Sequence, residues 1–351
     1  MQCPVRSDPL PTSPCAARKG RGNSNSNSNG GSNGNGNGNG NGNCNGNGNG
    51  NGNGNGNGSI PVASGPQGIA PLPGDPLEKS WHPTTVAAEG ELLSEVTIPG
   101  TISGFKAHSG YVYLPAAYFS TPRPALPVMV LLAGIPGQPK NFLAGLSTQN
   151  VYADLAKQHD GLAPILVFPD YTGGLTDDRG CLDSADGNVE TYLTKDVPAF
   201  VDTTFGATNG PAYTGIGGFS DGGTCALMIG LRHPDVYGPI LALSADMVPS
   251  FGGSGGYVAK FLDGDQSKLA EHSPLSLLSN GMPRPHCSIW LEAGDGEPAK
   301  QRQTIQMAAA ARAANIAVQL TTKPGKHSFD FWRTAISDSA EWVARSLGAI
   351  S

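Results

Sequence analysis

Fully apolar runs alternate along the chain with segments whose apolar positions recur every three or four residues. The runs 127–133 and 164–168 are apolar throughout, which indicates strands covered on both faces. Segments 190–205 and 221–231 instead carry apolar residues at helical spacing. This alternation predicts an α/β fold in which a doubly wound, mostly parallel sheet is flanked by helices.

The same pattern locates the remaining elements. Strands are expected at 92–98, 111–114, 127–133, 164–168, 212–217, 239–243, 288–292 and 317–321. Helices are expected at 151–159, 190–205, 221–231, 267–278, 299–314 and 335–347. Since the ligand crevice of such a sheet lies at the carboxyl ends of its strands, the functional residues should directly follow strands.

Composition divides the chain into three parts. Residues 22–58 are almost pure Asn-Gly and Asn-Ser repeat, which has nothing apolar to offset the entropy of ordering it, so we expect 1–58 to be a disordered tail. Residues 59–85 are rich in Pro and Gly and are typical of an extended linker. Residues 86–351 are then expected to form one α/β domain.

Charge and segment types narrow the classes of partner. The formal charge is −6 overall and +3 over residues 1–58, which leaves −9 for the rest and argues against a nucleic-acid partner. No apolar run is long enough to span a membrane, and the first 20 residues lack the apolar core of a secretory signal. Neither a nucleic-acid partner nor a membrane span is therefore expected.

The cysteines and histidines show no metal-ligand spacing, so we expect no metal and no other cofactor. Three cysteines lie in the domain: Cys181, Cys225 and Cys287. Cys181 with Cys225 is the pair to test as a disulfide, although a cysteine is also an ordinary small core residue and the sequence leaves this open.

The pattern Gly-x-Ser-x-Gly occurs three times, around Ser32, Ser220 and Ser254. Ser32 lies in the repeat tail, and Ser254 has neither a predicted strand before it nor a predicted helix after it, so both are interpreted as flexible loop. Ser220 follows the predicted strand 212–217 and opens the helix 221–231. That strand-turn-helix context is typical of an exposed serine nucleophile, with Gly218 and Gly222 relieving the crowding of the turn.

A serine nucleophile needs an imidazole base, which in this fold comes last along the chain. Among the histidines after Ser220, His233 ends a helix, His272 lies in a polar helix and His286 precedes a strand. His327 lies in a glycine-containing loop between the last predicted strand and the last helix. We therefore predict His327 as the base.

The acid should follow the strand 288–292, where the turn contains both Asp295 and Glu297. Either carboxylate could instead be a helix cap, and the residues alone leave both open. The oxyanion should be bound by the backbone amide of Asp221, which directly follows the nucleophile, and by that of Ile135 after the strand 127–133, because Pro136 has no N–H.

Several stretches carry a family resemblance. They are LLAGIPGQPKNF, GNVETYLTKDVPAFVD, GFSDGGTCALMIGLRHPDVYG, WLEAGDGEP and GKHSFDFW. Together they resemble the α/β-hydrolase esterase family that includes esterase D, the feruloyl esterases and the antigen-85 mycolyltransferases. In that family the acid commonly stands three residues after a glycine that ends the penultimate strand, which implies Glu297. Many actinobacterial members are secreted or membrane-anchored, so the resemblance implies an extracytoplasmic location.

These observations predict a serine esterase that hydrolyses a carboxylic ester or thioester through an acyl-enzyme on Ser220, with His327 and Glu297 completing a triad. The expected partner is thus a small-molecule ester or acyl substrate. An acyltransferase of the mycolyltransferase type would use the same residues, and a non-catalytic binding module on the same fold is the rival from another class. The loops 172–187 and 247–265 should form the acyl pocket, and their small and polar residues indicate an open site.

Overall fold

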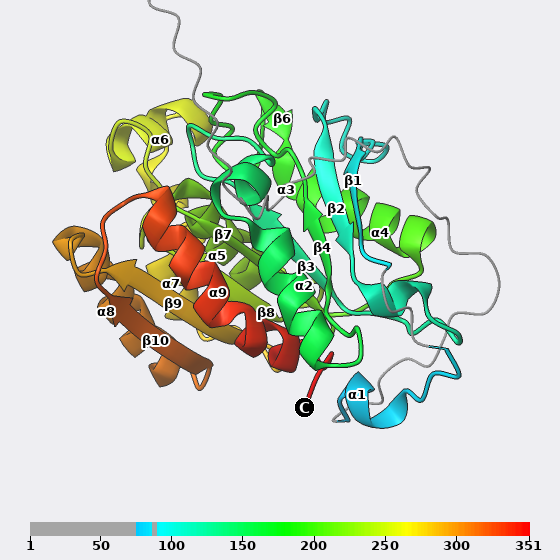
Figure 1. Ribbon diagram of the computed structural model, residues 1–351. Coiled ribbons are helices and arrows are strands. Elements are labelled where there is room, and N and C mark those ends of the chain that lie inside the picture. The colour runs from blue at the N-terminus through cyan, green and yellow to red at the C-terminus, as the bar shows by residue number, and fades with distance from the viewer. Residues whose placement is uncertain (1–74, 86–89) are drawn as a thin grey trace, which may run out of the picture. The chain divides into compact units, whose positions relative to one another are not determined.

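The computed structural model describes residues 75–85 and 90–351. Their centre is an eight-stranded sheet with the order β1-β2-β4-β3-β7-β8-β9-β10 (Figure 1). Its strands are β1 (Leu92–Val96), β2 (Gly110–Leu114), β3 (Val128–Leu132), β4 (Ile165–Phe168), β7 (Thr214–Phe219), β8 (Pro239–Leu243), β9 (Ser288–Gly294) and β10 (Ala317–Lys323). Strand β2 is antiparallel to both of its neighbours. The other strands after it in the sheet order, β4, β3, β7, β8, β9 and β10, run parallel to one another.

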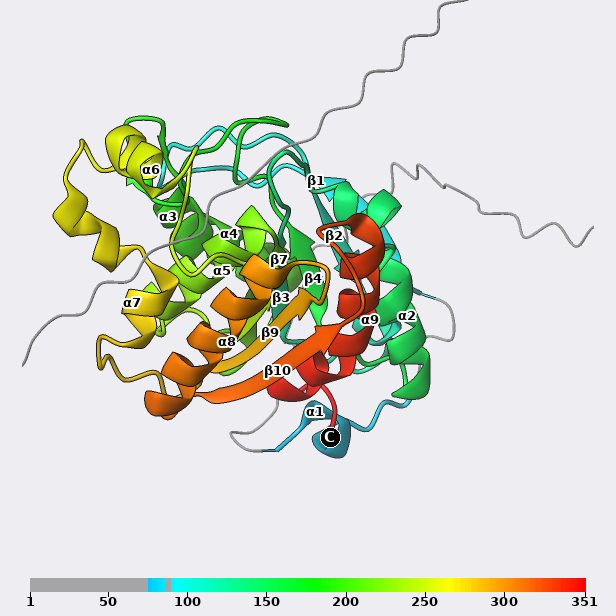
Figure 2. The same ribbon diagram turned by 90° about the vertical axis from the view of Figure 1, so that its left-hand side faces the viewer.

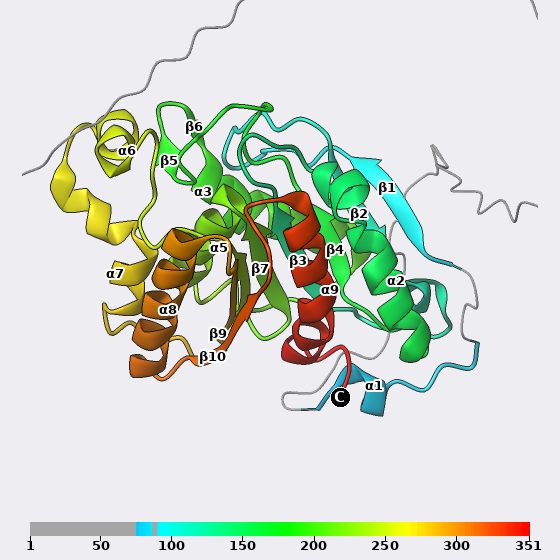
Figure 3. The same cartoon turned by 60° about the vertical axis from the view of Figure 1, so that its left-hand side comes forward.

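Helices cover both faces of this sheet. Helices α2 (Thr148–Gln158) and α9 (Phe329–Ser346) lie on one face, and α5 (Asp221–Arg232), α7 (Pro274–Leu278) and α8 (Pro298–Ala313) lie on the other (Figures 2 and 3). The remaining elements are α1 (Leu77–Ser80), η1 (Ala116–Phe119), η2 (Asn141–Gly145), α3 (Val189–Thr191), η3 (Tyr192–Asp196), α4 (Val197–Phe205), α6 (Ser254–Phe261), η4 (Gln266–Glu271) and a short hairpin of β5 (Asp183–Ser184) and β6 (Gly187–Asn188). The predicted doubly wound α/β fold is therefore confirmed.

The central strands are apolar because helices bury both of their faces. Every residue of β3, β4 and β8 is buried. Strand β7 contains Gly215 and Gly217, and a β-carbon on Gly217 would lie 2.7 Å from the Met129 side chain. This tight packing holds the end of β7, and with it Ser220, at a fixed position on the carboxyl edge of the sheet.

The predicted linker differs from the structure at its end. Residues 77–80 form the helical turn α1, in which Leu77 is fully buried, and Trp81 directly after it is also buried. The amide of Leu77 donates to the carbonyl oxygen of Gly348, near the end of the chain. Burial of these apolar side chains makes the segment part of the domain, which thus begins before residue 86. The predicted tail 1–58 and the linker up to residue 74 lie outside the described residues.

Two helix predictions were wrong at their boundaries. Helix α9 begins at Phe329 rather than at 335, because Ser328 caps it and accepts from the amide of Phe331. The expected helix 267–278 is divided into η4 and α7, with Pro274 opening the second helix.

Candidate active site

Ser220 lies at the turn between β7 and α5, with backbone angles φ 56° and ψ −124°. A residue other than glycine rarely adopts such a φ. The backbone of this turn is therefore strained, and the surrounding contacts must stabilise it. The Ser220 amide donates to the carbonyl oxygen of Leu243, and the amides of Gly223 and Thr224 donate to the carbonyl oxygen of Ser220. These bonds fix the backbone and leave the hydroxyl at the carboxyl edge.

The flanking glycines are required by close backbone approach. A β-carbon on Gly218 would come within 2.4 Å of the carbonyl oxygen of Leu132, and one on Gly222 within 2.1 Å of the same atom. Any side chain at either position would therefore displace β3 or the nucleophile turn. This is the crowding that the sequence pattern predicts around Ser220.

His327 lies beside the hydroxyl of Ser220. The distance from Ser220 Oγ to His327 Nε2 is 2.9 Å. The His327 ring makes an edge contact with Trp332, whose indole in turn stacks on Phe219. Trp332 of α9 thus packs between the His327 ring and Phe219 and supports the histidine loop.

Glu297 lies on the other side of His327. Its Oε1 atom is 2.5 Å from His327 Nδ1, and its Oε2 atom accepts a hydrogen bond of 2.8 Å from Ser244 Oγ. Burial alone would raise the pKa of Glu297, but the hydrogen bonds from His327 and Ser244 outweigh it and lower the pKa. The carboxylate is therefore held ionised, as a group that orients an imidazole must be.

Asp295, the competing carboxylate, has a different contact. Its Oδ1 atom accepts a hydrogen bond of 3.0 Å from the amide of Gly325, which belongs to the His327 loop. Neither Asp295 nor Glu297 caps α8 through its side chain. Asp295 joins the turn after β9 to the histidine loop.

Ser244 was missed by the sequence analysis. It directly follows β8, donates to Glu297 and accepts a hydrogen bond of 3.1 Å from Trp332 Nε1. Its position after a strand was the signal that could have identified it, since functional residues are expected there.

The turn after β3 approaches Ser220 closely. A β-carbon on Gly134 would lie 2.9 Å from the β-carbon of Ser220, so only glycine brings the turn this near. Ile135 follows it, half-buried, and Asp221 is the first residue of α5. The first amides of a helix have no acceptor within that helix, so the amide of Asp221 is available to a ligand.

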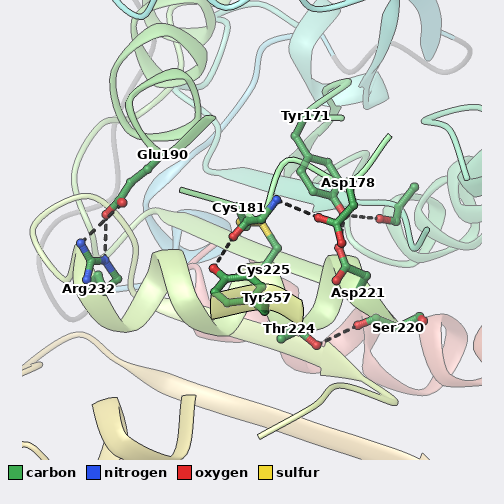
Figure 4. The surroundings of a disulfide bond; sticks show 12 residues. Tyr171, Asp178, Cys181, Glu190, Ser220, Asp221, Thr224, Cys225, Arg232 and Tyr257 are labelled. Atoms are coloured by element: carbon green, nitrogen blue, oxygen red, sulfur yellow. Dashed lines mark hydrogen bonds and ion pairs between the residues drawn. A yellow bond between two sulfur atoms is a disulfide. The ribbon is translucent and has the colours of Figure 1, made fainter. Parts of the chain in front are cut away.

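The side chain of Asp221 lies in an acidic cluster with Asp178, and Tyr171 lies between it and Ala133, the residue after β3 (Figure 4). The Tyr171 hydroxyl lies 2.8 Å from the carbonyl oxygen of Ala133 and 3.1 Å from Asp221 Oδ2. Burial first, and then the charge of Asp178, raise the pKa of Asp221 to about 7, although the Tyr171 hydrogen bond partly opposes them. No sequence pattern marks this cluster, because Asp178 lies in a loop 43 positions before Asp221.

A disulfide joins Cys181 to Cys225, with a Cα–Cα distance of 5.5 Å (Figure 4). It attaches the loop 172–187 to α5 about one turn after Ser220. The Tyr257 hydroxyl donates to the carbonyl oxygen of Gly180, and Lys260 donates to that of Asp178, so α6 packs on the same loop. The segments expected to border the acyl pocket thus lie side by side.

The interpretation of Ser254 as flexible loop was wrong, because Ser254 is the first residue of α6. The helix forms because Tyr257, Val258 and Phe261 are spaced to bury one face despite the adjacent glycines. The turn before it is not preceded by a strand, so Ser254 lacks the setting of Ser220.

The other histidines lie away from Ser220 and have their own surroundings. His233 pairs with Glu190 at 2.6 Å, His272 is buried, and His286 is exposed. Among residues 75–85 and 90–351, no group of three or more His, Cys, Asp or Glu side chains could hold a metal ion. Within the same described ranges, no helix has the length and apolar character needed to cross a membrane.

The sequence matches an esterase family and curated relatives. The profile of the putative esterase family matches residues 107–347. An uncharacterized protein of Corynebacterium glutamicum is 32% identical over 275 residues, which are 76% of this chain and 65% of that protein. The diacylglycerol acyltransferase/mycolyltransferase Ag85A of Mycobacterium ulcerans is 25% identical over 194 residues, which are 46% of this chain and 56% of that protein. The chain therefore spans between about half and two thirds of these relatives' own length, namely 65% of the first and 56% of the second.

Solved structures share the fold. A ferulic acid esterase superposes with a TM-score of 0.63 at 20% identity, covering 73% of this chain and 98% of its own. An S-formylglutathione hydrolase from Agrobacterium tumefaciens superposes with a TM-score of 0.62 at 19% identity, covering 76% of this chain and 98% of its own.

Proposed function

Because the chain belongs to the putative esterase family, we propose that it is a serine hydrolase of carboxylic esters or thioesters that forms an acyl-enzyme on Ser220. The observation that carries this proposal is the unbroken line of contacts from Ser220 Oγ to His327 Nε2 and from His327 Nδ1 to Glu297. A nucleophile, a base and an orienting carboxylate in this geometry are the requirements for acyl transfer through serine.

In the first half of the reaction, Ser220 Oγ attacks the carbonyl carbon while His327 Nε2 takes the hydroxyl proton. Glu297 keeps the imidazole in the tautomer with a proton on Nδ1 and stabilises the imidazolium that forms. The amides of Ile135 and Asp221 bind the oxyanion of the tetrahedral intermediate. The intermediate collapses, His327 returns the proton to the leaving oxygen or sulfur, and the acyl group remains on Ser220.

In the second half, His327 takes a proton from water as the water oxygen attacks the acyl-enzyme. The carboxylic acid leaves and Ser220 regains its proton. If an alcohol takes the place of water, the same steps produce a new ester. The similarity to the Mycobacterium ulcerans acyltransferase/mycolyltransferase favours acyl transfer to an alcohol as the second candidate function.

The experiment that tests the proposal is hydrolysis of p-nitrophenyl esters of increasing acyl length by the wild type, by Ser220→Ala and by Ser254→Ala. Loss of turnover in Ser220→Ala of about a thousandfold or more, with Ser254→Ala unchanged, is the expected result. Adding an alcohol acceptor and measuring the ratio of new ester to free acid distinguishes hydrolysis from acyl transfer.

A wild type that turns over no ester and is not labelled by a fluorophosphonate would reject the hydrolase. The remaining hypothesis would be that the protein is a binding module on the same fold, because the fold alone does not determine function. Equal loss in Ser220→Ala and Ser254→Ala would reject Ser220 as the specific nucleophile.

We also propose an extracytoplasmic location. The disulfide between Cys181 and Cys225 supports it, because such bonds persist in oxidising compartments.

A further inference from the structure

A cavity of about 290 Å³ opens at the carboxyl edge of the sheet. Its wall comes from the segment before β2, from the residues after the Gly134–Gly137 turn and from the residues after β4. This volume is near the lower end for small-molecule sites, which begin at roughly 300 Å³. The cavity is large enough for one substituent of a substrate.

The cavity adjoins the proposed oxyanion turn. Gly134 contacts the nucleophile, and the amide of Gly137 donates to the carbonyl oxygen of Leu175. Gln138 follows Gly137 and Gly174 precedes Leu175, and both Gln138 and Gly174 line the cavity. The cavity therefore borders the turn that carries the proposed oxyanion donor Ile135.

The one carboxylate among the described lining residues has its hydrogen bonds within the protein. Asp170 Oδ1 accepts from the amides of Thr172 and Gly173 and from the Thr172 hydroxyl. Its Oδ2 accepts from the amide of His108 and lies 3.5 Å from His108 Nδ1, so the His108 ring is directed to Asp170. The side chain of Asp170 is only 5% exposed. It shapes the wall and has little capacity left for a ligand.

The remaining polar lining is rich in donors. It consists of Lys140, His108, Ser109, Tyr111 and Gln138. Within the described part of the chain, Lys140 has no carboxylate within ion-pair distance, and the same is true of exposed lysines such as Lys268, but Lys140 is the lysine that lines this cavity. An ammonium in a cleft without a carboxylate partner can bind an anion. Because the domain carries a net negative charge, this positive charge would make the cavity selective for anionic groups.

We infer that this cavity is a subsite for a carboxylate carried by the ester substrate, with Lys140 supplying the positive charge and Gln138 and Tyr111 supplying neutral donors. The inference rests on the proposed function, because it assigns a specificity-determining contact to the same reaction. The carboxylate can belong to the acyl part or to the alcohol part, and the cavity chemistry is the same for both.

The test compares charged esters with their methyl esters. For the acyl side, the pair is p-nitrophenyl hydrogen adipate and p-nitrophenyl methyl adipate, and for the alcohol side it is para-acetoxybenzoate and its methyl ester. We expect the ratio of kcat/KM for charged over neutral ester to fall roughly threefold to tenfold in Lys140→Gln, because one partly exposed ion contact contributes about that much. Lys140→Arg should keep the ratio, and turnover of the neutral esters should stay within about twofold of wild type.

Lys268→Gln is the matched control, since Lys268 is also exposed and lies in η4, away from the cavity. A fall in the ratio for one pair identifies which part of the substrate carries the carboxylate. An unchanged ratio for both pairs in Lys140→Gln, or an equal fall in Lys268→Gln, overturns the inference.

A binding measurement separates this inference from the proposed function. Ser220→Ala should bind para-acetoxybenzoate more tightly than its methyl ester by calorimetry, and adding Lys140→Gln should abolish the difference. If wild type hydrolyses neutral esters but the charged ligand has no advantage, only the subsite is rejected. If no ester is turned over but the Lys140-dependent binding is present, only the hydrolase is rejected.

Discussion

The residue next to the nucleophile carries two separate groups with opposite effects on an oxyanion. The backbone amide of Asp221 is proposed to bind the oxyanion, while its carboxyl group lies in the cluster with Asp178 and Tyr171. A neutral carboxyl group at this position leaves the developing negative charge undisturbed, whereas a carboxylate repels it. The protonation state of Asp221 should therefore affect the rate.

We predict that the activity of wild type declines above neutral pH because Asp221 ionises. Burial and the charge of Asp178 raise the pKa of Asp221 to about 7, so the side chain is neutral below this pH and negative above it. Asp221→Asn keeps an acceptor for Tyr171 but cannot ionise, so its kcat/KM should not share the decline. We expect the kcat/KM of wild type to fall roughly threefold to tenfold between about pH 7 and pH 9, because one nearby, partly screened charge has an effect of this size.

The measurement is a pH profile of kcat/KM on a neutral ester. Asp202→Asn, which removes an exposed carboxylate of α4, is the control and should decline as wild type does. Parallel profiles of wild type and Asp221→Asn would show that this carboxyl group does not control the rate.

The candidate site was predictable from the sequence only in part, for reasons visible at single residues. Ser220 and His327 were singled out because each combines a residue type with a position after a predicted strand, and the structure brings them within 2.9 Å. Glu297 and Asp295 lie in the same turn, and only their contacts in space, with His327 and Gly325 respectively, distinguish them. Lys140 and Asp178 carry no local pattern at all, because their surroundings come from segments distant in the chain.

At the scale of elements, one ion cluster joins the segment before the nucleophile strand to the nucleophile helix. Glu190 of α3 pairs with Arg232, the last residue of α5, at 2.8 Å and with His233 at 2.6 Å. Burial would raise the pKa of Glu190, but the hydrogen bonds from His233 and Arg232 outweigh it and lower the pKa to about 2. The two contacts of Glu190 hold the end of α5 against α3.

We predict that Glu190→Gln destabilises the domain by about 3 kcal/mol near pH 7, because it leaves a partly buried Arg232 without its partner. The pKa of Glu190 is lowered by folding, so its contribution is complete above about pH 5 and is lost as the pH falls toward 2. The difference between wild type and Glu190→Gln should therefore shrink at about pH 3. Denaturant unfolding at both pH values measures this.

Glu341→Gln is the control for this prediction, because Glu341 forms an exposed pair with Arg345 on α9. Its loss should cost less than about 1 kcal/mol at either pH. A Glu190→Gln variant with the same deficit at both pH values would mean that the effect comes from packing and not from ionisation.

The elements themselves show which sequence signals carry information. The strands β3, β4 and β8 were found because they are buried on both faces and are therefore apolar at every position. Helix α6 was missed because Gly255 and Gly256 weaken the local helical pattern, and its existence depends on burial of Tyr257 beside the 172–187 loop. The antiparallel direction of β2 relative to its neighbours depends on pairing, which no single segment determines.

At the scale of the whole molecule, the bond between Cys181 and Cys225 links the active-site loop to the core. The two cysteines are 44 positions apart, and closing a loop of this length removes entropy worth roughly 4 kcal/mol from the unfolded chain. Domains are stable by only about 5–15 kcal/mol, so this bond alone can decide whether the domain folds. Stability should therefore depend on the redox state of the compartment.

We predict that reductant lowers the unfolding midpoint of wild type and has no effect on a Cys181→Ser/Cys225→Ser variant, which should start from the lower value. Cys287→Ser should respond to reductant as wild type does, because Cys287 is a free cysteine outside this bond. Thermal unfolding of the three proteins with and without dithiothreitol measures this. A wild type indifferent to reductant would contradict the role of the bond, and with it the argument for an extracytoplasmic location, since a chain equally stable with reduced cysteines would have no need of an oxidising compartment.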